Sequence, residues 1–147
     1  MVLIDSSVWI EALRRSGSLE VKVSLEALLE AFEATLCSPI KLEVLGGARV
    51  QERKALAEYF DILPYDPMPE STWQEAIELS WKLRDAGVTV PWNDLLIACR
   101  AIALKTRLYS CDKHFEVIAQ HAPLRLYRPG YGGRFEPETS EPGGMTK

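Results

Sequence analysis

The chain has 147 residues, of which 47% are hydrophobic; this size and apolar content fit one globular domain with a real core and leave little room for two. Its formal net charge of −4 and its pI near 5.3 exclude the global basic field that nucleic-acid binders often carry, so any contact with nucleic acid has to be local. The first apolar run meets Asp5 too early for a signal peptide, and no run approaches the roughly 18 to 20 residues of a membrane span. We therefore predict a soluble, cytoplasmic protein without a membrane segment.

Short apolar segments predict strands, and longer segments with apolar residues at helical spacing predict helices between them. The predicted strands lie at residues 2–4, 35–37, 62–64, 106–110 and 124–127. The predicted helices lie at residues 8–17, 19–34, 38–46, 49–60, 71–87, 92–105 and 115–120. Two helices carry start signals: Ser38 as an N-cap before Pro39, and Ser71 with Gln74 as a capping box. Strands that alternate with helices indicate an α/β fold with a parallel sheet.

The composition of the chain changes after Arg128. From residue 129 to residue 147, proline and glycine are frequent, together with Glu, Ser and Thr. Such a segment buries too little apolar surface to order itself. We therefore predict one folded domain at residues 1–128 and a flexible tail at residues 129–147, unless a partner or a second copy of the chain docks that tail.

Four acidic residues stand where predicted strands end or predicted helices begin: Asp5, Glu43, Asp94 and Asp112. Ligands of parallel α/β sheets bind beyond the carboxyl ends of the strands, so these four side chains can converge on one cleft. At separations of about 5 Å they repel by about 3 kcal/mol per pair at an effective dielectric constant of about 20, and protonation or cations must relieve this repulsion. Mg²⁺ or Mn²⁺ takes carboxylate ligands, activates a water and neutralises phosphate charge, which is the chemistry of metal-dependent nucleases. Each acid alone also has a structural explanation, as a turn or helix-start residue.

The motifs around these acids point to a family. The four motifs of PIN-domain ribonucleases, most closely those of VapC toxins from bacterial toxin–antitoxin pairs, resemble four segments of this chain in order and spacing. These segments are MVLIDSSVWI at residues 1–10, SPIKLEV at 38–44, NDLLIA at 93–98 and LYSCDKHF at 108–115. The resemblance covers nearly the whole chain up to about residue 128, and the combination is specific although no single motif is.

The resemblance implies a three-layer α/β/α sandwich with a central parallel five-stranded sheet in the order 3-2-1-4-5, and Mg²⁺- or Mn²⁺-dependent endonucleolytic cleavage of single-stranded or loop RNA. By position, the four acids match the family's metal-holding acidic quartet. Ser6, directly after the first acid, and Ser110, two residues before the last, match hydroxyl positions that support the acids and the water shell of the metal. The resemblance also implies a homodimer and a cognate VapB-like antitoxin that blocks the acidic pocket with an arginine.

Two other classes of protein with an acid after the first strand fit this sequence less well. A phosphotransferase of the haloacid dehalogenase type needs a second aspartate two residues after the first, where this chain has Ser7. A response-regulator receiver needs a phosphoacceptor after the third strand, where Asp61 and Asp66 are awkwardly placed. Both are disfavoured. A catalytically silent PIN-like module that captures a basic peptide or RNA in the acidic pocket remains the alternative.

Several polar residues have both a structural and a functional explanation. Three cysteines at wide spacing, Cys37, Cys99 and Cys111, predict buried reduced thiols rather than a disulfide framework or a metal site. His114 lies beside the last acid, and we interpret it as a surface turn residue in preference to a base or an RNA contact. Asn93 is interpreted as a helix cap rather than a substrate contact.

Aromatic and basic residues are the candidates for RNA contacts. Trp92, between Pro91 and Asn93, is the best candidate for stacking on a base, whereas Trp9, Trp73 and Trp81 have the helical spacing of core residues. A local set of basic side chains at the rim of the cleft would hold phosphates and reconcile an acidic protein with RNA binding. The candidates for this rim are Lys41, Arg49, Arg53, Lys54, Lys113 and Arg128.

Overall fold

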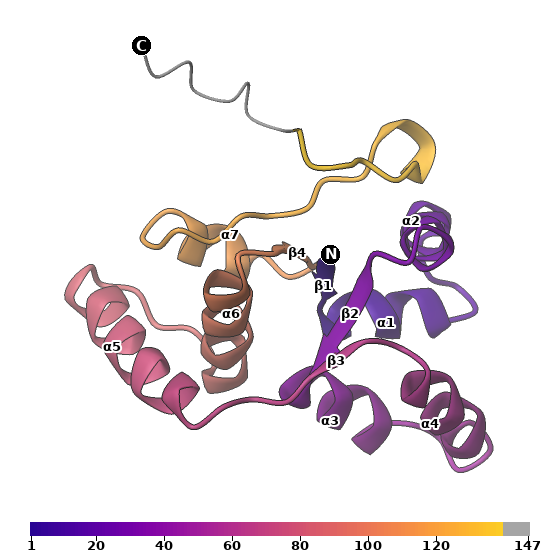
Figure 1. Cartoon of the computed structure of the whole chain (residues 1–147), viewed down its shortest axis with the longest axis horizontal. Helices are drawn as coiled ribbons and strands as arrows, with labels where there is room; N and C mark the ends of the chain where they lie inside the picture. The colour runs from indigo at the N-terminus through magenta and orange to yellow at the C-terminus, as the bar shows by residue number, and fades with distance from the viewer. Residues whose placement is uncertain (140–147) are drawn as a thin grey trace.

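A computed structural model describes residues 1–139 and has a parallel sheet with helices on both sides (Figure 1). The strands are β1 (Val2–Ile4), β2 (Ala34–Cys37), β3 (Tyr65–Asp66) and β4 (Arg107–Tyr109). Their order in the sheet is β3-β2-β1-β4, and every neighbouring pair is parallel. The first strand is therefore central, as the family resemblance implied.

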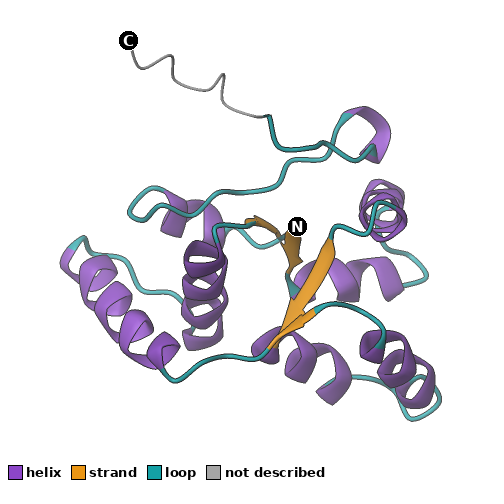
Figure 2. Ribbon diagram, viewed as in Figure 1, coloured by secondary structure: helices purple, strands orange, loops and turns teal. Residues whose placement is uncertain are grey.

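The helices form two groups, one on each side of the strands (Figure 2). One group contains α1, α2 and α4, and the other contains α5, α6 and α7, so the predicted three-layer α/β/α sandwich is confirmed. The helices are α1 (Ser6–Leu13), α2 (Leu19–Glu30), α3 (Ser38–Gly46), α4 (Arg53–Asp61), α5 (Ser71–Asp85), α6 (Trp92–Leu104) and α7 (His114–Ala119), followed by the 3-10 turn η1 (Tyr131–Gly133). No helix within residues 1–139 has both the length and the apolar character that crossing a membrane requires.

Two strands differ from the prediction. The third strand lies at Tyr65–Asp66, after the predicted residues 62–64, because the chain leaves α4 through a turn that still contains Leu63. The predicted fifth strand, residues 124–127, is reduced to one isolated parallel bridge between Leu108 and Leu126. Prolines at positions 123 and 129 flank this segment, and because proline has no N–H to donate, they limit the ladder to a few residues. The sheet among the described residues therefore has four strands, with the bridge at the expected fifth position beside β4.

Both predicted helix caps are wrong. The N-cap of α3 is Cys37, and the hydroxyl of Ser38 instead accepts from the backbone N–H of Met68 at 3.3 Å, which holds the chain leaving β3. The N-cap position of α5 is the residue before Ser71, and no side chain caps that helix, so the capping box with Gln74 is absent. Tertiary contacts of the serine and a one-residue shift of the helix start override these local signals.

The core lies between the sheet and the two helix layers. Trp9 is buried there and packs edge-on against Phe60, with ring centroids 4.9 Å apart. The prediction that Trp73 and Trp81 are also core residues is wrong, since they are 52% and 60% exposed. The face of α5 that is buried carries smaller residues instead: Thr72, Ala76, Leu79 and Leu83.

The three cysteines are free thiols, and two of them are buried as predicted. Burial raises the pKa of Cys37 and of Cys99 to about 12, so both stay protonated and unreactive at neutral pH. The prediction for Cys111 is wrong, because this residue follows β4 in a surface turn and is exposed.

The described part of the predicted tail, residues 129–139, packs against α2 through η1 (Figure 1), and Arg107 at the start of β4 donates to the carbonyl of Glu136 at 2.8 Å. Gly133 has φ +89, and a Cβ atom there would lie 3.0 Å from side-chain atoms of Val23 and Ser24, so this approach to α2 requires glycine. Farther along, the backbone N–H of Glu136 donates to the Tyr127 hydroxyl at 3.1 Å. Residues 140–147 of the predicted tail lie outside the described residues.

Candidate metal centre

The paired ends of β1 and β4 bring two of the four acids to one place. Ile4 and Tyr109 are partners in the parallel ladder, and the N–H of Asp5 donates to the carbonyl of Tyr109 at 2.9 Å. The residues that follow the two strands, Asp5 on one and Asp112 on the other, therefore emerge at the same edge of the sheet. The helices α3 and α6, which carry Glu43 and Asp94, contact each other at this edge.

Asp5 is the N-cap of α1 and is almost completely buried, with 3% of its surface exposed. Its Oδ2 accepts hydrogen bonds from the N–H of Ser7 at 3.2 Å, from the hydroxyl of Ser7 at 2.6 Å and from the hydroxyl of Ser110 at 2.9 Å. Burial raises the pKa of Asp5 and the charge of Glu43 adds to this rise, while the hydrogen bonds from the two serines oppose it. The carboxylate is thus held in one position by uncharged donors.

The hydroxyls of Ser7 and Ser110 join the ends of β1 and β4. They lie 3.1 Å apart, and the hydroxyl of Ser7 also accepts from the N–H of Cys111 at 3.0 Å. The hydroxyl of Ser110 accepts from the N–H of Asp112 at 2.9 Å. Ser110 therefore lies where the sequence placed it, next to two of the acids. The role of Ser7 was not predicted, although Ser7 directly follows Ser6 in the sequence.

Glu43 projects from the second half of α3 toward the other acids. Its Oε2 accepts from the hydroxyl of Ser6 at 2.6 Å, and its Oε1 accepts from the side-chain amide of Asn93 at 2.9 Å. Ser6 thus supports an acid as expected, but that acid is Glu43 rather than its neighbour in the chain. The interpretation of Asn93 as a helix cap is wrong, because the N-cap of α6 is Pro91 and the Asn93 side chain serves the acid cluster.

Asp94 and Asp112 converge on His114. The Nδ1 atom of His114 lies 2.8 Å from Oδ2 of Asp94 and 3.0 Å from Oδ1 of Asp112. Burial raises the pKa of Asp94 to about 6, and the charges of Asp5 and Asp112 add to the rise while the contact with His114 opposes it. His114 is thus exposed at the surface as interpreted, but it is the first residue of α7 and not a turn residue, and its ring contacts two of the acids. The sequence signal that could have found it is its position two residues after Asp112.

The four acids form one electrostatic unit. Asp5 responds to Glu43, and Asp94 responds to Asp5 and Asp112. Within residues 1–139 no lysine or arginine side chain forms an ion pair with any of the four. The negative charge of the cluster is therefore not neutralised by lysine or arginine. One ligand atom each from Asp94, Asp112 and His114 lie within 4.8 Å of one another, a spacing that suits a single cation.

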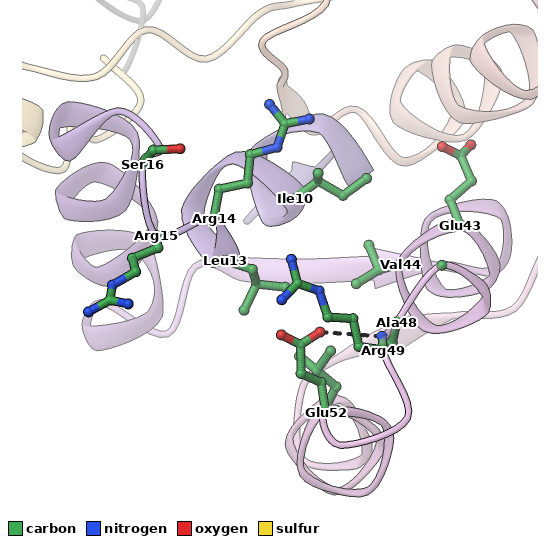
Figure 3. A pocket seen from close by; sticks show the side chains of 12 residues that line it. Ile10, Leu13, Arg14, Arg15, Ser16, Glu43, Val44, Ala48, Arg49 and Glu52 are labelled. Carbon is green, nitrogen blue, oxygen red and sulfur yellow. Dashed lines mark hydrogen bonds between the residues drawn. The ribbon is translucent and has the colours of Figure 1, made fainter.

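A groove of about 630 Å³ lies between α1 on one side and α3 and α4 on the other. Glu43 lies at one end of this groove, Arg14 and Arg49 line it, and the guanidinium group of Arg49 points into its middle (Figure 3). Half-exposed apolar side chains, among them Ile10 and Leu13, line the wall beneath them. Of the six basic residues predicted at the rim, only Arg49 lines this groove, and two other arginines that line it, Arg14 and Arg15, were not predicted.

A second, smaller cavity of about 230 Å³ flanks the cluster on the side of Asp112. Lys113 and Arg128 contribute its basic side chains, as predicted for the rim of the cleft. Arg128 also forms an ion pair with Glu116 at 3.0 Å. The acid cluster is therefore bordered by a groove at Glu43, which three arginines line, and by a smaller cavity at Asp112 with two basic residues. Each has one arginine in an ion pair, Arg14 with Glu11 at 3.7 Å and Arg128 with Glu116.

The sequence has relatives along most of its length. The family model described as PIN domain matches residues 2–120. VapC ribonuclease Mb1587 of Mycobacterium bovis and ribonuclease VapC11 of Mycobacterium tuberculosis are each 34% identical to this chain over 134 residues, which are 85% of this chain and 96% of the relative.

Solved structures share the fold at lower identity. VapBC2 of Rickettsia felis bound to a DNA fragment from its promoter has a TM-score of 0.71 at 21% identity, over 86% of this chain and 98% of that one. FitAcB of Neisseria gonorrhoeae has a TM-score of 0.69 at 17% identity, over 87% and 97%. The sarcin-ricin loop cleaving toxin VapC20 of Mycobacterium tuberculosis has a TM-score of 0.60 at 16% identity, over 85% and 99%.

Proposed function

The chain belongs to the PIN domain family, and from this premise we propose that it is an endoribonuclease of the VapC type, the toxin of a VapBC-type toxin–antitoxin pair. The observation that carries the proposal is the 34% identity, over 96% of their length, to relatives named VapC ribonucleases. Convergence of all four predicted acids at the carboxyl edge of the sheet supports it, because a hydrolase of this kind needs them together.

We propose that Asp5, Glu43, Asp94 and Asp112 hold one or two divalent cations, Mg²⁺ or Mn²⁺. The donor set fits such ions, since carboxylate oxygens are the ligands that both prefer. The pKa of Asp94 is raised to about 6, first by burial and then by the charges of Asp5 and Asp112. This supports the assignment, because a bound cation favours the charged form of a carboxyl in such surroundings. A bound divalent cation supplies an activated water and charge neutralisation for phosphodiester hydrolysis.

The polar residues around the acids orient the carboxylates of Asp5 and Glu43. Ser7 and Ser110 fix the carboxylate of Asp5, and Ser6 with Asn93 fixes both oxygens of Glu43. Neutral donors of this kind hold a carboxylate without cancelling its charge, which keeps its attraction for a cation. Such pre-organisation lowers the cost of ordering the site when the substrate phosphate arrives.

The substrate class that we propose is RNA, bound with its backbone along the groove beside Glu43. Arg14 and Arg49 line that groove, and arginine binds phosphate through two parallel hydrogen bonds. A local basic pair of this kind lets a chain of net charge −4 bind a polyanion. Trp92, 69% exposed at the start of α6, remains the proposed stacking contact.

The partner that we propose is a cognate VapB-like antitoxin, together with a second copy of this chain. Structures with the same fold are toxin–antitoxin complexes, and one is bound to promoter DNA. We also propose that the chain acts in the cytoplasm, where its RNA substrate is found and where three free thiols persist.

Cleavage of a pool of structured RNAs by the purified chain tests this proposal. We expect cleavage with Mg²⁺ or Mn²⁺, none with EDTA, and none in the Asp5→Asn variant. Full activity in Asp5→Asn would contradict the assignment of the acids. Binding of RNA or of a basic peptide without any metal-dependent cleavage would favour the catalytically silent binding module instead.

A further inference from the structure

The position of His114 within the acid cluster is not explained by the four carboxylates alone. Its Nδ1 atom is shared between Asp94 at 2.8 Å and Asp112 at 3.0 Å. No other nitrogen of a side chain that can bind a metal lies with the acids, because in the described chain the only cluster of this kind is Asp94, Asp112 and His114. The site thus has one nitrogen donor among its oxygen donors.

The fold holds this imidazole in place from two directions. His114 is the first residue of α7, and its backbone N–H donates to Oδ1 of Asp112 at 3.0 Å. Asp94 approaches from α6, which packs against α7. The ring is half exposed, with 46% of the side chain accessible, so its position follows from these polar contacts rather than from core packing.

The distances around Nδ1 match those between neighbouring ligands of a six-coordinate cation. With bonds of about 2.1 Å, adjacent corners of an octahedron are about 3.0 Å apart and opposite corners about 4.2 Å. The two distances from Nδ1, 2.8 and 3.0 Å, fit adjacent corners, and all three ligand atoms lie within 4.8 Å of one another. A small shift of each side chain therefore suffices to place one cation between them.

We propose that His114 is a ligand of the divalent cation through Nδ1, and that this nitrogen makes the site prefer Mn²⁺ to Mg²⁺. The inference rests on the proposed function, which places a cation at the four acids. It assigns a ligand that the acidic quartet does not contain, and a choice between the two ions that the quartet leaves open.

The preference follows from the chemistry of the donors. Mg²⁺ is a hard ion that binds oxygen and keeps much of its water, so exchange of a water for imidazole gains it little. Affinities of mixed nitrogen and oxygen sites for first-row transition ions follow a rising order that begins at Mn²⁺. A nitrogen ligand therefore adds affinity for Mn²⁺ that it does not add for Mg²⁺.

Pulsed electron paramagnetic resonance of Mn²⁺ bound to the full-length chain tests the proposal, because directly bound imidazole nitrogen gives its own hyperfine coupling. The chain has two histidines, His114 and His121, and the second lies beyond the other end of α7. We expect the nitrogen coupling in the wild-type protein and in His121→Ala, and its loss in His114→Ala. His114→Gln, which offers an amide oxygen in place of the ring nitrogen, is expected to lose the coupling as well.

Metal titrations of the same proteins measure the preference. We expect His114→Ala to lower the affinity for Mn²⁺ by about tenfold, the order of effect seen when a residue that supports a metal is removed, and to change the affinity for Mg²⁺ by less than about twofold. His121→Ala should leave both affinities unchanged. Circular dichroism of each variant checks folding, which the half-exposed His114 ring is expected to leave intact.

The outcomes separate this inference from the function on which it rests. Mn²⁺ bound by the wild-type protein without imidazole coupling, or with coupling that persists in His114→Ala, would overturn the role of His114 and leave the metal-dependent nuclease standing. An equal loss of Mn²⁺ and Mg²⁺ affinity in His114→Ala would show that the imidazole only orients Asp94 and Asp112. Absence of any Mn²⁺ binding would overturn both proposals.

Discussion

The acid cluster has two halves that are built differently. In the serine half, the hydrogen bonds that Asp5 and Glu43 accept within residues 1–139 all come from uncharged donors, namely Ser6, Ser7, Asn93 and Ser110. In the histidine half, Asp94 and Asp112 converge on a single imidazole nitrogen. The carboxylates of the serine half are therefore held in position before any cation binds. In the histidine half, the oxygen atoms of Asp94 and Asp112 contact the imidazole nitrogen, and a cation could bind between these three atoms.

The difference shows how one site can combine rigidity with attraction for a cation. Hydroxyl and amide donors position a carboxylate but leave its negative charge in place. In both halves burial raises a carboxyl pKa, that of Asp5 in the serine half and that of Asp94, to about 6, in the histidine half, where the charges of Asp5 and Asp112 add to the rise. We expect the two halves to respond differently to substitution, to pH and to added metal.

The largest expected effect is the loss of RNA cleavage when an acid of either half is replaced. The two halves should differ in how the replacement changes the stability of the fold. Asp94→Asn and Asp5→Ala should both abolish RNA cleavage. Asp94→Asn should leave the Tm unchanged or raise it by up to about 3 °C, because it removes like-charge repulsion. Asp5→Ala should lower the free energy of unfolding by about 1 to 3 kcal/mol, because α1 loses its N-cap and the buried hydroxyl donors lose their acceptor.

Thermal unfolding of both variants, with cleavage assays alongside, measures the contrast. A large fall in Tm for Asp94→Asn would mean that this carboxylate is structural, and the histidine half would then be no different from the serine half.

The next expected effect is on the pH dependence of stability without metal. The pKa of Asp94 rises from 3.8 to about 6 on folding, so the folded state binds the proton more tightly than the unfolded state. The stability that this carboxyl contributes is full below pH 3.8 and is lost as the pH rises through about 6. The wild-type protein should therefore lose stability over this range relative to Asp94→Asn.

Unfolding curves in EDTA from pH 4 to pH 8, for the wild-type protein and for Asp94→Asn, give the difference directly. Addition of Mn²⁺ at pH 7 should restore stability in the wild-type protein only. Parallel curves for the two proteins at all pH values would place the titration elsewhere than at Asp94.

A third expected effect distinguishes the cavities that flank the two halves. In an Asp94→Asn background, which should not cleave, the double change Arg14→Glu and Arg49→Glu should weaken RNA binding by about tenfold or more. It should also reduce the magnitude of the slope of log K against log salt concentration by about 1.4, the value for two phosphate contacts with single-stranded nucleic acid. Lys113→Glu, beside the histidine half, should weaken binding by less, because it reverses one charge instead of two.

Fluorescence anisotropy with a labelled RNA measures these affinities. Lys82→Glu, on the exposed face of α5, changes the net charge by as much as Lys113→Glu and by half as much as the double change, and serves as the control. An equal loss in Lys82→Glu would indicate a general effect of charge. Unchanged RNA binding with weaker capture of a basic antitoxin peptide would assign the groove to the antitoxin.

The smallest expected effect concerns the junction of β1 and β4 in the serine half. Ser7→Ala removes a donor to Asp5 and the acceptor of the Cys111 N–H, which should cost about 1 to 2 kcal/mol of stability. Ser16→Ala, at an exposed position after α1, should change stability by less than about 0.5 kcal/mol. Chemical denaturation measures both. Equal stability of the two variants would mean that the hydroxyl of Ser7 does not join the strands.

Local pattern was sufficient for most of the fold. The apolar runs at residues 2–4 and 35–37 are strands as predicted, and the apolar spacing from residue 92 onward gave α6. The pattern failed where a tertiary contact competes with a local signal. Ser38 has the residue type and position of an N-cap, but its hydroxyl binds the chain after β3. Trp73 and Trp81 have core spacing, but smaller residues on α5 face the core.

The acids of the candidate site were predicted from the sequence, but most of their hydrogen-bond partners were not. An acid at a strand end or near a helix start shows in the sequence, because strand and helix boundaries are local features. The partners do not show, because a hydrogen bond depends on where two distant side chains point. Asn93 and His114 each stand beside a predicted acid, yet Asn93 serves Glu43 and His114 reaches back to Asp94.

The sequence by itself determined the family, the α/β/α layers and the four carboxylates at the carboxyl edge of the sheet, since these follow from the order of apolar periods and from motifs of a few residues. Only the tertiary structure decided that the cluster has a serine half and a histidine half, and that Arg14 and Arg49 share a groove that ends at Glu43. The physical reason is that charge and hydrogen bonding act over a few ångströms in space, and folding brings to that distance residues that are far apart in the chain.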